Sequence, residues 1–412
     1  KQEIDNEKNN AEKEDPVSEV AEPVSEVAEP VSEVAEPVSG TETADVDKPA
    51  RKPVNVKRVK SVLWNVFLVA VIAVGIISLL GVVKEIGHDG SSFGEVMRGA
   101  SPLFFVLLAA VVVAGMALDV AKFCIIGKTV TGKCRLGASA KTNFLGKYYD
   151  AVTPFATGGQ PMQIYYLNTK GISGGNSSAI VLIRYIFSIM CWIILGAALM
   201  IAGAAKGVLD GVSGGNLLKI TGWVGIGINL IIPVFVLLFL LLPKLMRRLS
   251  SGVIWLGCKI RLVKDADKAK ERAEKIVDDF KNSFKLMAKS PVNFVLLIAV
   301  CFLESAITFA VPYFVMLAFS CPVDGLFITV SSLNVYAIFG VSFIPTPGNS
   351  GVIEGMGALA FSVAAGPALV WSVIAWRLFT FYIYIIIGIF ISVYDIIRKN
   401  KRGKSLQGRL EQ

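Results

Sequence analysis

Six ionisable residues of this chain fall inside segments that are otherwise long and apolar. They are Lys147, Asp150, Arg184, Glu304, Glu354 and Arg377. A charge at the centre of a bilayer costs about 2.5–3.5 kcal/mol on insertion scales, so such residues usually face a cavity and pair with one another. Arginine presents a planar fork that matches a phosphate at two points. We therefore expect Arg184 and Arg377 to bind a lipid phosphate.

The other members of this set have alternative roles. Glu354 is expected to pair with one of the arginines in the empty state, or to meet a cationic headgroup. Lys147 and Asp150 are expected at a cytoplasmic mouth. For all six residues the alternative is an ion-pair network that stabilises the fold. A further acid, Asp119, is expected near a helix end, from which its side chain reaches the interface.

Chemistry that needs a metal or an acid–base pair has little support in the sequence. His88 is the single histidine, it lies in a short polar loop, and none of the six cysteines forms a C-x-x-C pair. This pattern disfavours a zinc or haem site, and we predict no metal and no cofactor. An enzyme would have to use Asp150, Glu304 or Glu354 as its acid or base, and we assign no catalytic residue.

Two motifs rich in proline and glycine interrupt apolar segments, TPFATGGQP at 153–161 and IPTPGNSG at 344–351. Broken backbone at membrane depth is tolerated where it is buried in protein or lines a wet cavity. Half-helix N-termini there offer free N–H groups to an anion. The alternative is a pair of kinks filled by tight packing. Beside Arg184, Glu354 and Arg377, the predicted substrate-binding residues are Thr153, Pro154, Gly158, Gly159, Gln160, Gln163, Pro345, Pro347, Gly348, Asn349 and Gly351.

The segments around these residues decide the class of protein. Of the 412 residues, 54% are hydrophobic and 18% are charged, whereas soluble domains have about a quarter charged residues. Runs of 18 or more apolar residues can cross roughly 30 Å of hydrocarbon as helices. We predict an all-α polytopic membrane protein with about six full transmembrane helices and two broken re-entrant hairpins, at 138–177 and 326–366. The six helices are expected at 62–83, 101–127, 178–204, 218–242, 291–319 and 367–394.

The predicted elements fall into two halves with the same order: two helices, a broken hairpin and a long helix. The first half starts inside and the second outside, which makes an inverted repeat. Arg184 follows Gly159 by 25 residues, and Arg377 follows Gly348 by 29. Many secondary transporters use such repeats to place a binding site near the bilayer midplane. The two membrane repeats are expected at 61–206 and 207–395, and the segment 326–366 either re-enters the membrane or makes two thin crossings.

Basic residues cluster at four places beside the predicted spans, 51–60, 122–147, 244–289 and 398–409. The positive-inside rule puts these clusters and both termini in the cytoplasm. Lys122 is counted in the second cluster. Juxtamembrane position accounts for the basic charge, so we do not expect nucleic acid as a partner. The first apolar run is too long for a cleavable signal peptide and lacks a small-residue cleavage site.

Three polar segments flank the membrane repeats. Residues 1–60 form a predicted disordered tail with repeats of PVSEVAE, and its first 50 residues hold 15 acidic and 4 basic side chains. A proline in every repeat prevents a continuous helix, and the acidic excess favours an extended spacer or a ligand for something basic. Residues 396–412 form a basic tail. The third segment is the basic linker 243–290.

This linker contains a predicted amphipathic helix at about 264–289, with a face rich in lysine and arginine opposite an apolar face. Two placements fit this pattern equally well. The helix lies on the anionic inner leaflet, or it packs against the protein's own cytoplasmic face. The apolar face consists of Ala269, Ala273, Ile276, Val277, Phe280, Phe284 and Met287.

These motifs resemble the flippase-like membrane domain of lysylphosphatidylglycerol synthases. The resemblance covers roughly 60–395, and it rests on TPFATGGQP with the following Gln163-Ile164-Tyr165-Tyr166-Leu167, on PTPG at 345–348, and on the arginine in the next helix. It implies a module that translocates phosphatidylglycerol derivatives or another anionic or isoprenoid-linked lipid. In full-length synthases a soluble aminoacyl-transferase domain follows, whereas about 15 residues follow the last helix here, so we do not expect transferase activity.

Two other classes of function stay open beside a lipid flippase of the plasma membrane. One is a membrane-embedded enzyme acting on a lipid headgroup, such as a phosphatidylglycerol lysyltransferase. The other is a non-catalytic partner of a membrane enzyme, for which the amphipathic linker and the acidic tail would supply contacts. Anionic membrane lipids are the expected partners in each case.

Overall fold

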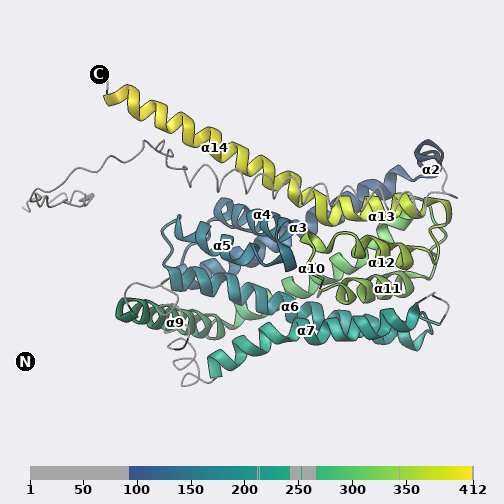
Figure 1. Ribbon diagram of the computed structural model, residues 1–412, viewed down its shortest axis with the longest axis horizontal. Coiled ribbons are helices and arrows are strands. Elements are labelled where there is room, and N and C mark those ends of the chain that lie inside the picture. The colour runs from purple at the N-terminus through teal and green to yellow at the C-terminus, as the bar shows by residue number, and fades with distance from the viewer. Residues whose placement is uncertain are drawn as a thin grey trace, which may run out of the picture. The chain divides into compact units, whose positions relative to one another are not determined.

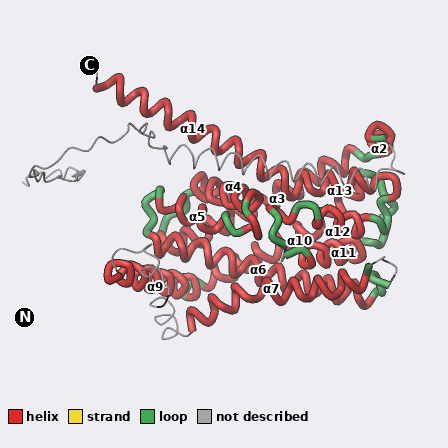
Figure 2. The backbone as a smooth tube through the Cα atoms, in the orientation of Figure 1, coloured by secondary structure: helices red, strands yellow, loops and turns green. Residues whose placement is uncertain are grey.

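The computed structural model describes residues 92–210, 212, 214–241, 252, 266–342 and 344–410. The acidic tail, the first predicted span at 62–83, His88 and the linker residues 243–251 and 253–265 lie outside these residues. In the described part every regular element is helical, and no strand occurs there (Figure 2).

Five helices of the described part are long and apolar enough to cross a membrane. With 21–32 residues each, they measure about 32–48 Å at 1.5 Å per residue, more than the hydrocarbon thickness of roughly 30 Å. The prediction of an all-α polytopic membrane protein is therefore confirmed, and the predicted ends lie within a few residues of those observed. The five are α3 (Pro102–Thr131), α6 (Gly174–Ala205), α7 (Gly215–Leu241), α10 (Pro291–Ala318) and the segment Gly366–Asp395.

That last segment is composed of four consecutive helical pieces. A short 3₁₀ turn, η4 (Gly366–Ala368), precedes α13 (Leu369–Arg377), and a π-helical turn, η5 (Leu378–Tyr382), leads into α14 (Ile383–Leu410). The sequence predicted one uninterrupted helix at 367–394. A π turn inside an α-helix is rare and often marks a functional site.

Both predicted broken hairpins are present as hairpins of two shorter helices (Figure 1). None of these helices has more than 17 residues, so each is at most about 26 Å long and falls short of a full crossing. For 326–366 this favours the re-entrant alternative over two thin crossings. The elements are α4 (Leu136–Val152), η2 (Pro154–Ala156) and α5 (Gly159–Asn168) in the first hairpin, and α11 (Phe327–Gly340), η3 (Pro347–Asn349) and α12 (Val352–Phe361) in the second.

The two hairpins occupy related places in the bundle. α3 packs along α10, and the first hairpin lies against α14 through α4 while the second lies against α6 and α7 through α11. Each hairpin thus contacts the long closing helix of the other half, and the two 3₁₀ turns touch each other. The order of elements is the same on both sides, as an internal repeat requires, whereas the predicted repeat boundaries stay predictions.

The linker helix α9 (Ala266–Ala288) lies beside α6 (Figure 1). Phe280 and Met287 are almost fully buried there, and the Ser283 hydroxyl donates to the Asn176 side chain on α6 at 3.2 Å. These contacts favour packing against the protein itself over lying on the leaflet. Ile276, on the same predicted apolar face, is 43% exposed.

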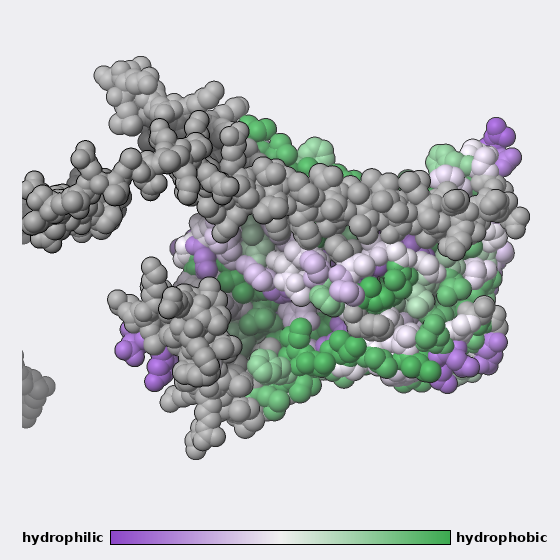
Figure 3. Space-filling model, in the orientation of Figure 1, coloured by the Kyte–Doolittle hydropathy of each residue, from purple (hydrophilic) through white to green (hydrophobic). Residues whose placement is uncertain are grey.

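Apolar side chains also cover the outer face of α7. Figure 3 shows this apolar band along the lower edge of the view, with hydrophilic residues near its ends. An outward face of this kind suits contact with lipid tails. The exposed residues include Leu217, Ile220, Ile231, Ile232 and Phe235. A short helix, α2 (Phe93–Gly99), precedes α3 and begins with a capping box at Ser92.

Candidate functional site

A cavity of about 390 Å³ lies where the two halves meet. Its walls come from α3, α4, α5, α6, α10, α11 and α12, from the η3 turn, and from the segment 376–384 around the π turn. Asp119 and Glu304 line it near the middle of α3 and α10, about 18–26 Å from either helix end. The cavity therefore lies near mid-depth of the long helices.

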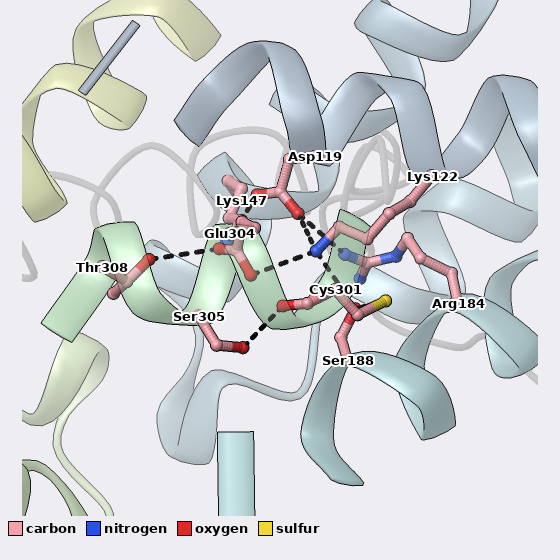
Figure 4. Close-up of polar contacts among 9 residues, drawn as sticks. All are labelled: Asp119, Lys122, Lys147, Arg184, Ser188, Cys301, Glu304, Ser305 and Thr308. Atoms are coloured by element: carbon pink, nitrogen blue, oxygen red, sulfur yellow. Dashed lines mark hydrogen bonds and ion pairs between the residues drawn. The ribbon is translucent and has the colours of Figure 1, made fainter. Parts of the chain in front are cut away.

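Asp119 is the centre of a charge cluster on one wall (Figure 4). Its carboxylate lies 2.6 Å from the Lys122 amine, 3.1 Å from the Lys147 amine and 3.8 Å from Arg184. These three cations come from α3, α4 and α6, so one buried acid ties three elements together. A buried carboxylate requires such partners.

Glu304 extends the cluster from α10. Figure 4 shows the Lys122 amine between the carboxylates of Asp119 and Glu304, and the second distance is 3.3 Å. The same amine donates to the Ser188 hydroxyl at 3.1 Å, and the Thr308 hydroxyl donates to Glu304 at 3.2 Å. Lys122 thus has three hydrogen-bonding or ionic partners and is held in one position.

The predictions for Asp119 and Lys122 were wrong. Asp119 was expected to reach the interface from a helix end, and Lys122 to belong to a cytoplasmic basic cluster, yet each is 1% exposed. Both are stable at depth because Glu304, Lys147 and Arg184 arrive from other elements and balance their charges.

Arg184 is the least satisfied cation of this cluster. The residue is 7% exposed, and its nearest carboxylate in the described part of the chain is 3.8 Å away. Its Nε has no hydrogen-bond partner there. One face of the guanidinium lies 4.9 Å from the centre of the Phe123 ring. A buried N–H without a partner is costly, so an acceptor placed beside the Arg184 Nε would offset that cost.

Arg377 has a contrasting environment on the opposite wall. Its Nε donates to Glu354 at 2.7 Å, and its terminal nitrogen donates to Ser350 and to the carbonyl of Gly348 at 3.3 Å each. Glu354 is fully buried and also accepts the Gly351 N–H at 2.6 Å. The predicted pairing of Glu354 with an arginine is confirmed, and the pair braces the second broken motif.

The structure brings half of the predicted site residues together. Those that line the cavity are Lys147, Asp150, Gln160, Arg184, Glu304, Gly348, Asn349 and Arg377. Glu354 lies behind Arg377. Several residues of the first motif hold the hairpin instead: the Thr153 hydroxyl donates to the Tyr149 carbonyl at 2.7 Å and accepts the Gly158 N–H at 2.9 Å. The Gly159 N–H donates to Asp150 at 2.8 Å.

The remaining predicted residues lie away from the cavity lining. Gln163 is buried on the inner side of α5 against Gly146, and its side-chain oxygen has no partner in the described part. Pro154, Pro345 and Gly351 lie in the two helix interruptions. Both interruptions contain residues with left-handed backbone, Phe155 and Ala156 in the first motif and Gly348, Asn349 and Gly351 in the second.

Sequence reasoning also missed lining residues. Asp119 and Lys122 stand three positions apart in an apolar run, a spacing that places them on one helix face, and this signal could have identified them. The polar and aromatic residues that complete the lining lie in apolar segments and carry no such signal. They are Tyr185, Ser188, Trp192, Thr308, Trp376, Phe379, Thr380 and Tyr384.

The lining offers charges of both signs and several hydroxyl groups. Four cations and three carboxylates face the cavity, and one of these cations, Arg377, is paired with the buried Glu354 behind it. Within the described residues, no group of three or more His, Cys, Asp or Glu side chains could hold a metal ion. Such a lining can bind an anionic group through its cations and an amine through its carboxylates.

A comparison with curated proteins finds no match. In contrast, residues 65–388 match the family described as the lysylphosphatidylglycerol synthase TM region. This match covers more than three quarters of the chain and contains the whole cavity lining. The chain therefore belongs to the lysylphosphatidylglycerol synthase transmembrane-region family and is a membrane protein related to lipid modification or transport.

Proposed function

We propose that the protein is a lipid flippase, which moves an anionic phospholipid between leaflets with the headgroup passing through the central cavity. The lipid phosphate binds Arg184, and Lys147 lies in the same cluster. The observation that carries this proposal is the state of Arg184, a buried cation that lines the cavity with its nearest described carboxylate at 3.8 Å and its Nε unpartnered.

The lining as a whole supports the same ligand. The lysines and arginines among the lining residues offer complementary charge to a headgroup that carries a phosphate. The volume of about 390 Å³ is within the range of small-molecule sites, roughly 300–1,000 Å³. Asp119, Asp150 and Glu304 would meet an amine if the headgroup carries one, as a lysyl-phosphatidylglycerol-type lipid does.

Location near mid-depth of the long helices supports transport. A headgroup bound there is about equally far from both surfaces, and the two broken motifs that touch each other border the same cavity. In transporters built from repeats, a site at this place becomes open to one side and then to the other. We place the protein in the plasma membrane with both termini in the cytoplasm, following the basic clusters.

The test is translocation of fluorescent phosphatidylglycerol in proteoliposomes. The wild type is expected to exceed protein-free vesicles, and Arg184→Gln is expected to fall to the protein-free rate. The matched control is Arg98→Gln on α2, which removes the same charge from an exposed position and should leave the rate unchanged.

Two results would overturn the proposal. One is a wild-type rate that does not exceed protein-free vesicles for several anionic lipids. The other is equal translocation by the folded Arg184→Gln variant. Formation of a modified lipid by the wild type, with no translocation, would instead favour a lipid-headgroup enzyme, and stable co-purification of a membrane enzyme would favour a non-catalytic partner.

A further inference from the structure

A second cavity, of about 740 Å³, lies between the first hairpin and α14. We call it the lateral pocket. Four basic residues line it, Arg135, Lys141, Lys170 and Arg398, and none of its described lining residues is acidic. It shares no lining residue with the central cavity. The sequence placed some of these cations in separate basic clusters, whereas the fold collects them around one space.

The basic groups are held in position by local contacts. Arg135 at the start of α4 donates to the carbonyl oxygen of Lys170 beyond the end of α5, at 3.1 Å. The amines of Lys141 and Lys170 lie 5.4 Å and 5.3 Å from the centre of the Tyr166 ring. Lys141 also pairs with Asp395. In the described part of the chain Lys170 and Arg398 have no carboxylate partner, so the pocket keeps uncompensated positive charge.

The pocket is at the end of a membrane span. The apolar segment that includes the first part of α14 ends at Asp395, and Arg398 follows within one turn. Phe390 and Tyr394 line the pocket and are 71% and 61% exposed. Exposed aromatic side chains next to lysine and arginine are typical of the membrane–water interface. This places the basic groups at headgroup level and the apolar wall at the level of the first acyl carbons.

We propose that the lateral pocket binds the phosphate of an anionic phospholipid of the cytoplasmic leaflet. Basic groups near a membrane surface attract anionic headgroups, and the exposed aromatic wall gives the acyl chains an apolar surface that a soluble phosphate would not need. The basic residues put this pocket on the cytoplasmic side by the positive-inside rule.

The lateral pocket also adjoins the central cavity. Phe144 lines the pocket and Tyr384 lines the cavity, and their ring centres are 6.4 Å apart. The Lys147 amine in the cavity lies 5.5 Å from the same Tyr384 ring. One layer of aromatic side chains thus separates the two spaces. A role of the pocket in loading lipid into the cavity rests on the proposed flippase function, whereas phosphate binding in the pocket does not.

The test measures binding of phosphatidylglycerol to the purified full chain by native mass spectrometry. The variant is Arg135→Gln/Lys170→Gln/Arg398→Gln. Its control is Lys128→Gln/Lys133→Gln/Lys289→Gln, which removes three exposed lysines outside the pocket. We expect the pocket variant to bind phosphatidylglycerol more than about tenfold more weakly than the control variant. Millimolar inorganic phosphate should not displace the lipid, and phosphatidylcholine should bind weakly to all three proteins.

Three outcomes would overturn the proposal. The first is equal binding of phosphatidylglycerol by the pocket variant and the control variant. The second is binding of phosphatidylcholine to the wild type as tightly as phosphatidylglycerol. The third is complete displacement of the lipid by inorganic phosphate, which would indicate a soluble anion instead. Arg184→Gln separates this inference from the flippase proposal. It should keep lipid binding in the lateral pocket even where translocation is lost.

Discussion

The two broken hairpins have similar backbones, but the arginines on the helices that follow them are paired differently. In each, two shorter helices flank a 3₁₀ turn with left-handed residues, and a carboxylate accepts an N–H at the start of the second helix, Asp150 in the first hairpin and Glu354 in the second. Arg377 is paired with Glu354 at 2.7 Å, whereas Arg184 is 3.8 Å from Asp119. The arginine of the second half is tightly paired, whereas the arginine of the first half keeps an Nε without a hydrogen-bond partner in the described part.

The closing helices differ in the same sense. α6 continues as an α-helix past Arg184, whereas a π turn directly follows Arg377. This turn brings Phe379 and Thr380 to the cavity lining. Its Phe381 ring lies 4.1 Å from the Arg377 guanidinium. In the second half the arginine therefore stabilises the local structure of the site. Mutations should separate this structural role from ligand binding.

The largest expected effect is that of Glu354→Ala. It leaves the Arg377 guanidinium buried without a carboxylate, and breaking a buried pair in this way destabilises by about 3–5 kcal/mol. We expect a strongly lowered melting temperature in detergent, measured by intrinsic fluorescence, together with loss of monodisperse protein.

Two matched variants check the cause. Removing both charges, as Glu354→Ala/Arg377→Met, should recover part of the lost stability, because no unpaired charge then remains. Arg184→Gln in the first half should lower the melting temperature much less. If Arg184→Gln lowers the melting temperature as much as Glu354→Ala does, the two halves do not differ in how much their arginine contributes to stability.

Asp119→Asn is expected to have an intermediate effect. It removes the described carboxylate partner of Lys147 and of Arg184, while Lys122 keeps Glu304 and Ser188. We expect a loss of about 2 kcal/mol, typical of a buried polar group that loses its partner. The cavity gains one formal positive charge, so anionic lipid should bind more tightly and restore part of the melting temperature.

Asp324→Asn is the control for this prediction, since it removes an exposed carboxylate. It should change neither the melting temperature nor the shift caused by phosphatidylglycerol. The contrary result is a destabilised Asp119→Asn variant whose melting temperature rises no more with phosphatidylglycerol than with phosphatidylcholine. This result would contradict a cavity that binds phosphate.

Local patterns in the sequence predicted much of the fold. Runs of apolar residues located the spans closely, as at 178–204, where the helix is Gly174–Ala205. Clusters of proline and glycine located both interruptions, because proline removes a helical hydrogen bond and glycine tolerates left-handed backbone. The arginines and Glu354 were identified because a charge in an apolar run is conspicuous by itself.

Features that depend on distant partners were not predictable in this way. Lys122 is stable at depth because of Glu304, which is 182 positions away in the chain, and no local pattern reports such a partner. The lateral pocket likewise needs α4, α5 and α14 to meet. The choice between leaflet and protein for α9 also depended on contacts with α6. The left-handed residues Phe155 and Ala156 are not glycines, so their types did not indicate this backbone conformation.

The left-handed residues Phe155 and Ala156 give the smallest expected effect on stability. Ala156 is exposed and has φ of 51°, a conformation that costs a residue with a Cβ about 1–2 kcal/mol. Ala156→Gly should therefore stabilise the protein by about 1 kcal/mol, because it relieves this strain and removes no packed side chain. In the second motif Gly348 has φ of 58°, and a Cβ there would overlap the Phe381 ring, so Gly348→Ala should destabilise. Melting temperatures that move in the same direction for both variants would show that the two breaks do not carry comparable backbone strain.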